Sequence, residues 1–104
     1  MDELMKGLNL PQDFDELEQY CQALSTPDLR RLRDRVMSTL QGIEVEIKLK
    51  NEEYLRLRHT DQETRVYLGW KAQTMKAHRA LSDQYRSIRR VLEERQTTAS
   101  GAAG

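Results

Sequence analysis

The sequence has few of the residues that build β-rich or disulfide-bonded folds. Of 104 residues only 6% are aromatic, with two prolines, five glycines and one cysteine. A single cysteine excludes an intramolecular disulfide and a cysteine-based metal cluster, and it favours a reducing compartment such as cytoplasm. The glycines form no phosphate-binding loop. A core with so few aromatics comes from Leu, Ile, Val, Met and Ala, which is typical of a helical bundle.

The chain also lacks long apolar runs and net charge. No apolar run exceeds three residues, which excludes a transmembrane helix, and the first ten residues do not resemble a signal peptide. Lys plus Arg number 17, as do Asp plus Glu, so the formal net charge is zero. This balance argues against a protein whose main role is to coat nucleic acid. We therefore expect one small cytoplasmic domain (host cytoplasm if the source is a virus) with no membrane contact.

The segment GIEVEIKL, residues 42–49, presents two periodicities. Its apolar residues alternate strictly with charged ones, which is the period of a half-buried strand. Yet Leu40, Ile43 and Ile47 continue a spacing of three and four residues that begins at Leu29, and this spacing predicts a helix. Gly42 opposes the helix by about 1 kcal/mol. The sequence favours an all-α fold, and the alternative is an α+β fold with a small β-meander over residues 43–70.

Capping residues place three helices, at about 13–24, 27–59 and 61–95. Asp13 is the expected cap of the first helix, and Thr26 that of the second, with Pro27 suited to its first turn. Thr60 and Glu63 have the spacing of a capping box for the third. Residues 1–96 then form a single helical domain, and residues 97–104 have nothing to bury and form a disordered tail.

The short turn near residue 60 makes the two long helices antiparallel neighbours. The result is a coiled-coil-like hairpin about 50 Å long. The short first helix can cover the open end of this hairpin, where residues 27–40 meet residues 81–95. It cannot also cover the end with the turn.

Apolar residues off the main seam therefore predict self-association as a dimer or higher homo-oligomer. They lie toward the turn on both long helices, and the expected interface consists of Val45, Leu49, Leu68, Ala72 and Met75. The alternative interpretation is a slightly apolar exposed face, which is common on monomeric proteins.

Arginines gather at the other end of the predicted hairpin. The antiparallel arrangement brings together a basic patch made of Arg30, Arg31, Arg33, Arg86, Arg89 and Arg90. Residues 1–24 carry six carboxylates against one lysine. This acidic segment can neutralise the patch, within one chain or between chains. If it swings away, the arginines are free to bind phosphate, nucleic acid or an acidic protein.

Candidate chemistry is sparse, so we expect no enzyme and no cofactor. Cys21 with His59 or His78 would be a possible nucleophile and base, but Cys21 falls on the apolar side of its helix and is better explained as a small buried residue. The two histidines lack metal-ligand spacing. Tyr67 and Trp70 beside lysines can stack nucleic-acid bases, although their seam spacing favours core packing near the turn.

The stretch VYLGWKAQTMKAHRALSDQYRSIRRVLEER, residues 66–95, resembles short arginine-rich helical hairpins encoded by bacteriophages. The resemblance rests on Tyr67, Trp70, Ala77, Ala80, Leu81, Leu92 and Arg95, and it implies a viral source but no single activity. We expect a noncatalytic protein–protein interaction module that self-associates and bridges or blocks an unidentified protein partner. A phage assembly factor or an inhibitor of host machinery fits this expectation. The alternative is a nucleic-acid or nucleotide binder that uses the arginine-rich end.

Overall fold

The computed structural model of the chain describes residues 8 and 10–103, with side chains through residue 98. Helix α2 spans Phe14–Ala23, α3 spans Thr26–Arg56 and α4 spans Asp61–Ala103. No strand occurs among these described residues, so the all-α prediction is confirmed and the β-meander alternative is wrong. GIEVEIKL lies wholly inside α3, because its apolar positions continue the helical spacing of the preceding turns.

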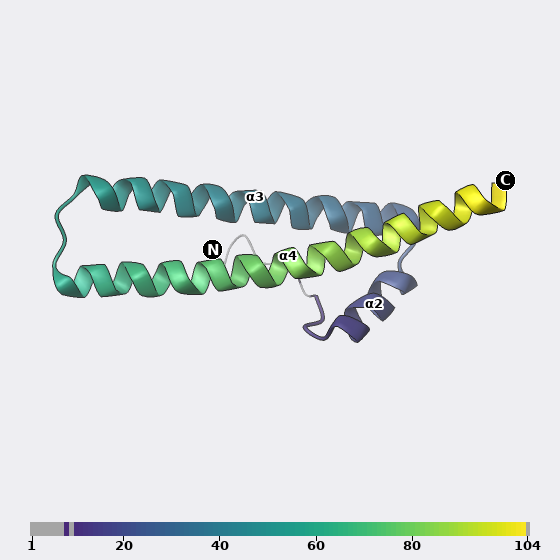
Figure 1. The fold of residues 1–104 in the computed structure, drawn as a ribbon, viewed down its shortest axis with the longest axis horizontal. Coiled ribbons are helices and arrows are strands. Elements are labelled where there is room, and N and C mark those ends of the chain that lie inside the picture. Colours follow the sequence, from purple (N-terminus) through teal and green to yellow (C-terminus); the bar gives the residue numbers. More distant parts are fainter. Residues whose placement is uncertain (1–7, 9, 104) are drawn as a thin grey trace.

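Helices α3 and α4 run antiparallel, side by side, and a short loop joins them at one end (Figure 1). The molecule is elongated, with extents of 63 × 23 × 18 Å. Helix α2 packs on α4 near the end opposite this loop (Figure 1). The short helix therefore covers the open end of the hairpin, as the sequence predicts. We call residues 44–73 the turn half and the remainder of the hairpin, with α2, the open half.

Side-chain oxygens cap the starts of α2 and α3. Asp13 Oδ1 accepts the backbone N–H of Asp15 at 2.8 Å, so the predicted cap of α2 is confirmed. The sequence predicts Thr26 as the cap of α3, but Ser25 takes this place, and its Oγ accepts the N–H of Asp28 at 3.3 Å. Starting the helix at Thr26 keeps Pro27 in the first turn, where no N–H is required.

The end of α4 differs from the predicted disordered tail over residues 97–104. The helix continues through Ala103, and only Gly104 of that segment lies outside the described residues. Once a long helix exists, each added residue gains a hydrogen bond without the cost of nucleation. No proline interrupts QTTASGAA, so the backbone of this segment can extend the helix.

The buried core lies entirely in the open half. Its apolar members come from all three helices: Leu17, Cys21, Leu29, Val36, Leu40, Ile43, Leu81, Ile88 and Val91. Most lie on the seam spacing that the sequence displays. Val91 is buried because α2 covers its side of α4. Within residues 44–73, by contrast, no side chain is buried, so two helices alone shape this half.

Candidate interaction surfaces

The six arginines of the predicted basic patch lie on α3 and α4 in the open half, and most of them have carboxylate partners. Five of the six make ion pairs: Arg31 with Asp28 (3.5 Å), Arg33 with Asp34 (3.1 Å), Arg86 with Asp83 (3.9 Å), Arg89 with Glu93 (3.2 Å), and Arg90 with Glu18 (3.8 Å) and Glu94 (3.9 Å). Within the part of the chain that the structure describes, only Arg30 of the six lacks such a pair. This pairing reduces the charge that the patch offers to a phosphate.

The acidic first segment contributes to this neutralisation in one place that the structure describes. Glu18 of α2 reaches Arg90 of α4, with Oε2 at 3.8 Å from Nη2. The other five pairs join neighbours on one helix. Exposed pairs of this kind contribute little to stability, typically about 0–1 kcal/mol. Their main effect is on the surface potential.

Arg95 has a different role, because it holds the end of α2. Its guanidinium donates to the carbonyl oxygens of Cys21 (3.0 Å) and Gln22 (3.1 Å) and to Thr26 Oγ1 (3.3 Å). The last carbonyls of a helix have no partner within the helix. A side chain of α4 therefore satisfies carbonyls at the α2–α3 junction. Sequence analysis did not find this role, since the contacts span about 70 residues.

A ladder of aromatic rings packs the turn end. Tyr54 stacks against His59 with ring centroids 4.0 Å apart and against Tyr67 at 4.1 Å, nearly parallel in both cases. Trp70 follows Tyr67 at 6.3 Å, and Lys50 Nζ lies 4.5 Å from the Trp70 ring. We call these rings the aromatic ladder. It provides packing at the end of the hairpin where the aliphatic core is absent.

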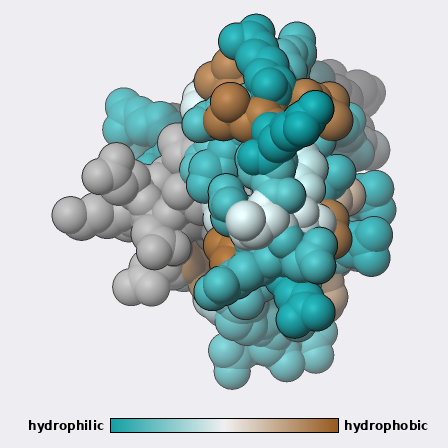
Figure 2. All heavy atoms as spheres, turned by 90° about the vertical axis from the view of Figure 1, so that its left-hand side faces the viewer, coloured by the Kyte–Doolittle hydropathy of each residue, from teal (hydrophilic) through white to brown (hydrophobic). Residues whose placement is uncertain are grey.

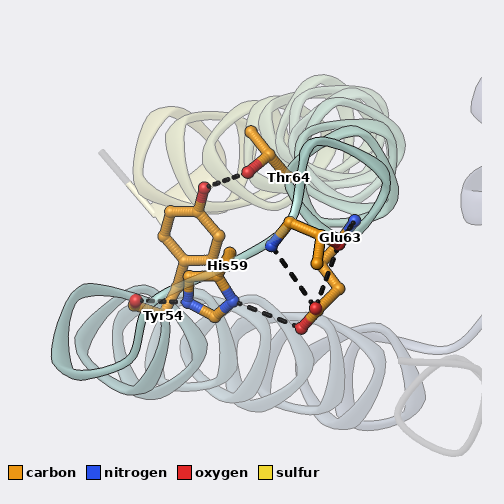
Figure 3. A network of polar contacts seen from close by, with 5 residues as sticks. Tyr54, His59, Glu63 and Thr64 are labelled. Atoms are coloured by element: carbon orange, nitrogen blue, oxygen red, sulfur yellow. Dashed lines mark hydrogen bonds and ion pairs between the residues drawn. The ribbon is translucent and has the colours of Figure 1, made fainter.

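Polar contacts fix the loop beside the ladder (Figure 3). Thr60 and Glu63 form the predicted capping box, with Glu63 N–H donating to Thr60 Oγ1 at 3.1 Å and Thr60 N–H donating to Glu63 Oε1 at 3.4 Å. His59 Nε2 donates to the carbonyl of Tyr54 at 2.6 Å, and its Nδ1 lies 3.6 Å from Glu63 Oε2. The Tyr54 hydroxyl meets Thr64 Oγ1 at 2.9 Å. The loop is thus tied to both helices.

The geometry of the ladder favours core packing over base stacking. Both faces of the Tyr54 ring are covered, one by His59 and the other by Tyr67, and Lys50 sits over Trp70. The Tyr67 hydroxyl donates to Asn51 Oδ1 at 2.6 Å. Rings that already stack on one another offer few free faces to a base. An open groove of about 380 Å³ runs along the ladder, with Leu57 and Val66 beside it.

The five predicted interface residues are all exposed, but they occupy two different surfaces. Val45 (56% exposed) and Leu49 (59%) lie on α3. Val45 is two residues, or about 200°, from the buried Ile43, so it faces away from α4. We call this pair the back surface. The other three residues, Leu68, Ala72 and Met75, lie on one side of α4 and are called the α4 stripe.

The α4 stripe borders a groove between the two long helices. Ile47, Ala72 and Met75 contribute apolar atoms to this groove, which has a volume of about 550 Å³. Its basic lining comes from Lys71, Lys76 and Arg79. The only carboxylate that lines it, Glu44, is 3.0 Å from His78 Nε2. The lining of the groove therefore combines apolar and basic side chains.

Cys21 and the histidines do not form a site. Cys21 is buried in the core, and this burial raises the pKa of its thiol, which Glu18 also raises while Arg95 opposes the shift. His59 lies in the α3–α4 loop and His78 on α4 beside Glu44, so each contacts a different part of the hairpin. Among the described residues, no three His, Cys, Asp or Glu side chains gather closely enough to hold a metal ion.

None of the helices that the structure describes has the length and apolar character needed to cross a membrane. Comparison of the chain with family models, curated proteins and solved structures finds no match. The resemblance of residues 66–95 to phage hairpins therefore stays a prediction. Any function has to be argued from the surfaces of this chain.

Proposed function

We propose that this chain is a noncatalytic protein–protein interaction module that self-associates and bridges or blocks a protein partner. One observation carries the proposal, namely the unequal distribution of apolar residues along the hairpin. Nine large apolar side chains in the described part of the chain are exposed, and six of them lie in the turn half: Val45, Leu49, Leu55, Leu57, Val66 and Leu68. That same half contains no buried side chain.

Two helices bury only the seam between them, whereas stable bundles of this kind usually contain three or four helices around a shared core. In the open half α2 acts as the third helix. No described element does so in the turn half. Figure 2, which views the turn end, shows hydrophobic atoms gathered over the end of α3 among hydrophilic ones. Contiguous exposed apolar surface of this kind marks interaction sites.

Two separate apolar surfaces suit a protein that both self-associates and holds a partner. The back surface and the α4 stripe lie on different sides of the hairpin, so one can be covered by a second copy while the other remains available. We assign self-association to the back surface, Val45 with Leu49, because these exposed apolar side chains face away from α4 and can therefore meet a second copy. A symmetric dimer places the same pair of residues from each copy against its equivalent.

The resemblance to phage hairpins supports a setting for this activity in the host cytoplasm. There the protein would serve as an assembly factor for the virus particle or as an inhibitor that covers a surface of a host protein. Both roles require the chain to bind another protein, and neither requires catalysis.

Nucleic-acid binding through the open end is the alternative function, and the ion pairs of the arginines count against it. An accessible patch of unpaired cations is what gives phosphate binding its strength. Binding to an oligonucleotide that is lost when Arg30 and Arg33 are changed to Glu would favour the alternative.

Light scattering tests self-association directly. We expect the wild-type chain to have a mass of at least twice its 12.2 kDa. The double variant Val45→Asp with Leu49→Asp should be monomeric with unchanged helix content, because charges would be buried without partners at the contact. Ser38→Asp with Gln41→Asp is the matched control, since it adds the same charge to exposed positions of α3. A monomeric wild type at every concentration would refute self-association.

A further inference from the structure

The middle of α4 carries cations without any carboxylate. Residues 64–82 contain no Asp or Glu, and their Lys and Arg residues are Arg65, Lys71, Lys76 and Arg79. This composition differs from that of the whole chain, in which acidic and basic residues are equal in number. A stretch of a helix whose charged residues are all positive gives its surface a local positive potential, even in a protein with no net charge.

The helical spacing sets these cations around the α4 stripe. Counting from Arg65, the residues Leu68, Ala72, Met75 and Arg79 follow at intervals of three and four, so all five lie along one side of the helix. An arginine thus stands at each end of a row of apolar side chains. From Arg65 to Arg79 the helix rises by about 21 Å. Leu68 and Met75 are each more than half exposed.

The two lysines flank this row. Lys71 lines the groove toward α3, together with Met75 and the half-buried Ile47. Lys76 follows Met75 directly and is exposed, as are Arg65 and Arg79. The apolar row is therefore bordered by positive charge at its ends and along its sides.

These four cations have no carboxylate partner within the described part of the chain. The ion pairs found there involve other residues. Glu44, the carboxylate that reaches the groove, is engaged by His78 at 3.0 Å. This contrasts with Arg89 and Arg90, which pair with acids on the same helix. The residues that the structure describes therefore leave the charges around the stripe uncompensated.

We propose that the α4 stripe and its four cations bind an acidic amphipathic helix of a partner protein. This inference rests on the proposed function and names the chemistry of the partner. Such a helix presents apolar residues at three- and four-residue spacing, and they lie along Leu68, Ala72 and Met75. Its Asp and Glu residues flank that apolar face and meet the lysines and arginines. Laying an apolar helical face into a groove is a common mode of peptide recognition.

The apolar row distinguishes this occupant from a nucleic acid. Phosphate groups would pair with the cations, but they would leave Leu68 and Met75 without contacts and would gain nothing from covering them. The aromatic rings that could stack a base are packed within the ladder. Methionine, which adapts its shape to different partners, suits an apolar helix face instead.

Fluorescence anisotropy with designed peptides on the full chain tests the inference. The probe is a labelled 16-residue amphipathic helical peptide with Leu on one face and Glu at its margins. The comparison peptides replace every Glu by Gln, every Glu by Lys, or every Leu by Ser. We expect the acidic peptide to bind at least about tenfold more tightly than each of the other three, because both its charge and its apolar face contribute.

Variants of the stripe locate the binding. Arg65→Glu with Arg79→Glu should weaken the acidic peptide at least about tenfold and strengthen the Lys peptide, since the charge complementarity is reversed. Leu68→Ser with Met75→Ser should weaken the acidic peptide to a similar degree. Lys48→Glu with Arg56→Glu, an equal charge reversal at exposed positions of α3, is the control and should leave binding within about twofold.

Three results would overturn the inference. The first is that the acidic peptide binds no better than the Gln peptide, and the second is that the Lys48/Arg56 control lowers its affinity as much as the stripe variant does. The third is that a single-stranded oligonucleotide binds more tightly than the peptide and that the serine variant does not change its affinity. That result would mean that the cations bind phosphate groups.

Light scattering on the same samples separates the two proposals. An oligomer without peptide binding refutes only this inference, and peptide binding by a monomer refutes only self-association.

Discussion

Arg95 illustrates how a single side chain on one helix can determine how another helix ends. Helix α2 ends without a glycine cap, and its last carbonyls would otherwise depend on water. The guanidinium presents several donors in a planar fork, and it reaches Cys21 O, Gln22 O and Thr26 Oγ1 at once. The position of α2 on the open end therefore depends on this residue as well as on apolar packing.

Replacing Arg95 by Ala should destabilise the protein by about 1–3 kcal/mol, because the carbonyls at the end of α2, of which that of Cys21 is part-buried, lose a charged donor. Urea unfolding followed by circular dichroism measures the change. Arg86→Ala is the control, since Arg86 is exposed and pairs with Asp83 on the same helix, and it should change stability by less than about 0.5 kcal/mol. Equal effects of the two variants would show that Arg95 contributes only surface charge.

At the scale of single residues, contacts between residues close in sequence were predictable, and contacts between residues far apart in sequence were not. Asp13 as a cap and the Thr60–Glu63 capping box follow from residue types at fixed short offsets, and both are present. The Tyr67–Asn51 hydrogen bond and the contacts of Arg95 join residues far apart in sequence. Such contacts depend on how the helices are placed against each other, which a local pattern does not specify.

At the scale of the helices, apolar periodicity predicted which segments are helical. It did not predict the residue at which α3 begins or the residue at which α4 ends. The spacing from Leu29 to Ile47 correctly outweighed the strand-like alternation of GIEVEIKL, since the helical period persisted beyond that segment. The start of α3 was misplaced by one residue because Ser25 and Thr26 are both good caps. The helical end of α4 was missed because a lack of burial does not by itself end a helix.

The α3–α4 loop allows the capping box at the start of α4 to be tested by the pH dependence of stability. Hydrogen bonds from the Thr60 side chain and backbone lower the pKa of Glu63 below its usual value of 4.5, and His59 adds to the shift. A carboxylate with a lowered pKa in the folded state stabilises that state above its usual pKa. The contribution disappears as the pH falls through the lowered value.

We therefore expect Glu63→Gln to be less stable than wild type near neutral pH and to approach wild type in strong acid. Gln retains an acceptor oxygen for the capping box but lacks the charge. Urea midpoints of the two proteins measured from about pH 7 to about pH 2 give the comparison. Glu53→Gln removes an exposed carboxylate outside the capping box and is the control. A stability difference that stays constant across this range would contradict the assignment.

Along the whole molecule, packing is concentrated at one end. The three-helix open half holds every buried side chain from Leu17 to Val91. The two-helix turn half relies on the aromatic ladder and the polar contacts of its loop. The back surface and the α4 stripe could both be located on the sequence as apolar positions off the seam. Their separation onto different sides required the structure, because it depends on the direction in which each helix faces its neighbour.

This asymmetry predicts a gradient of hydrogen exchange that also reports self-association. Local openings are frequent where few side chains are buried, so amides of residues 44–73 should exchange faster in dilute solution than those of residues 29–43 and 81–91. A second copy on the back surface should slow exchange around Val45 and Leu49 as the protein concentration rises, while exchange in the core of the open half stays unchanged.

Mass spectrometry of peptides at two protein concentrations measures both effects. The variant Val45→Asp with Leu49→Asp is the control and should lose the concentration dependence. Uniform protection along the hairpin in dilute solution would mean that the turn half is stable without a further helix.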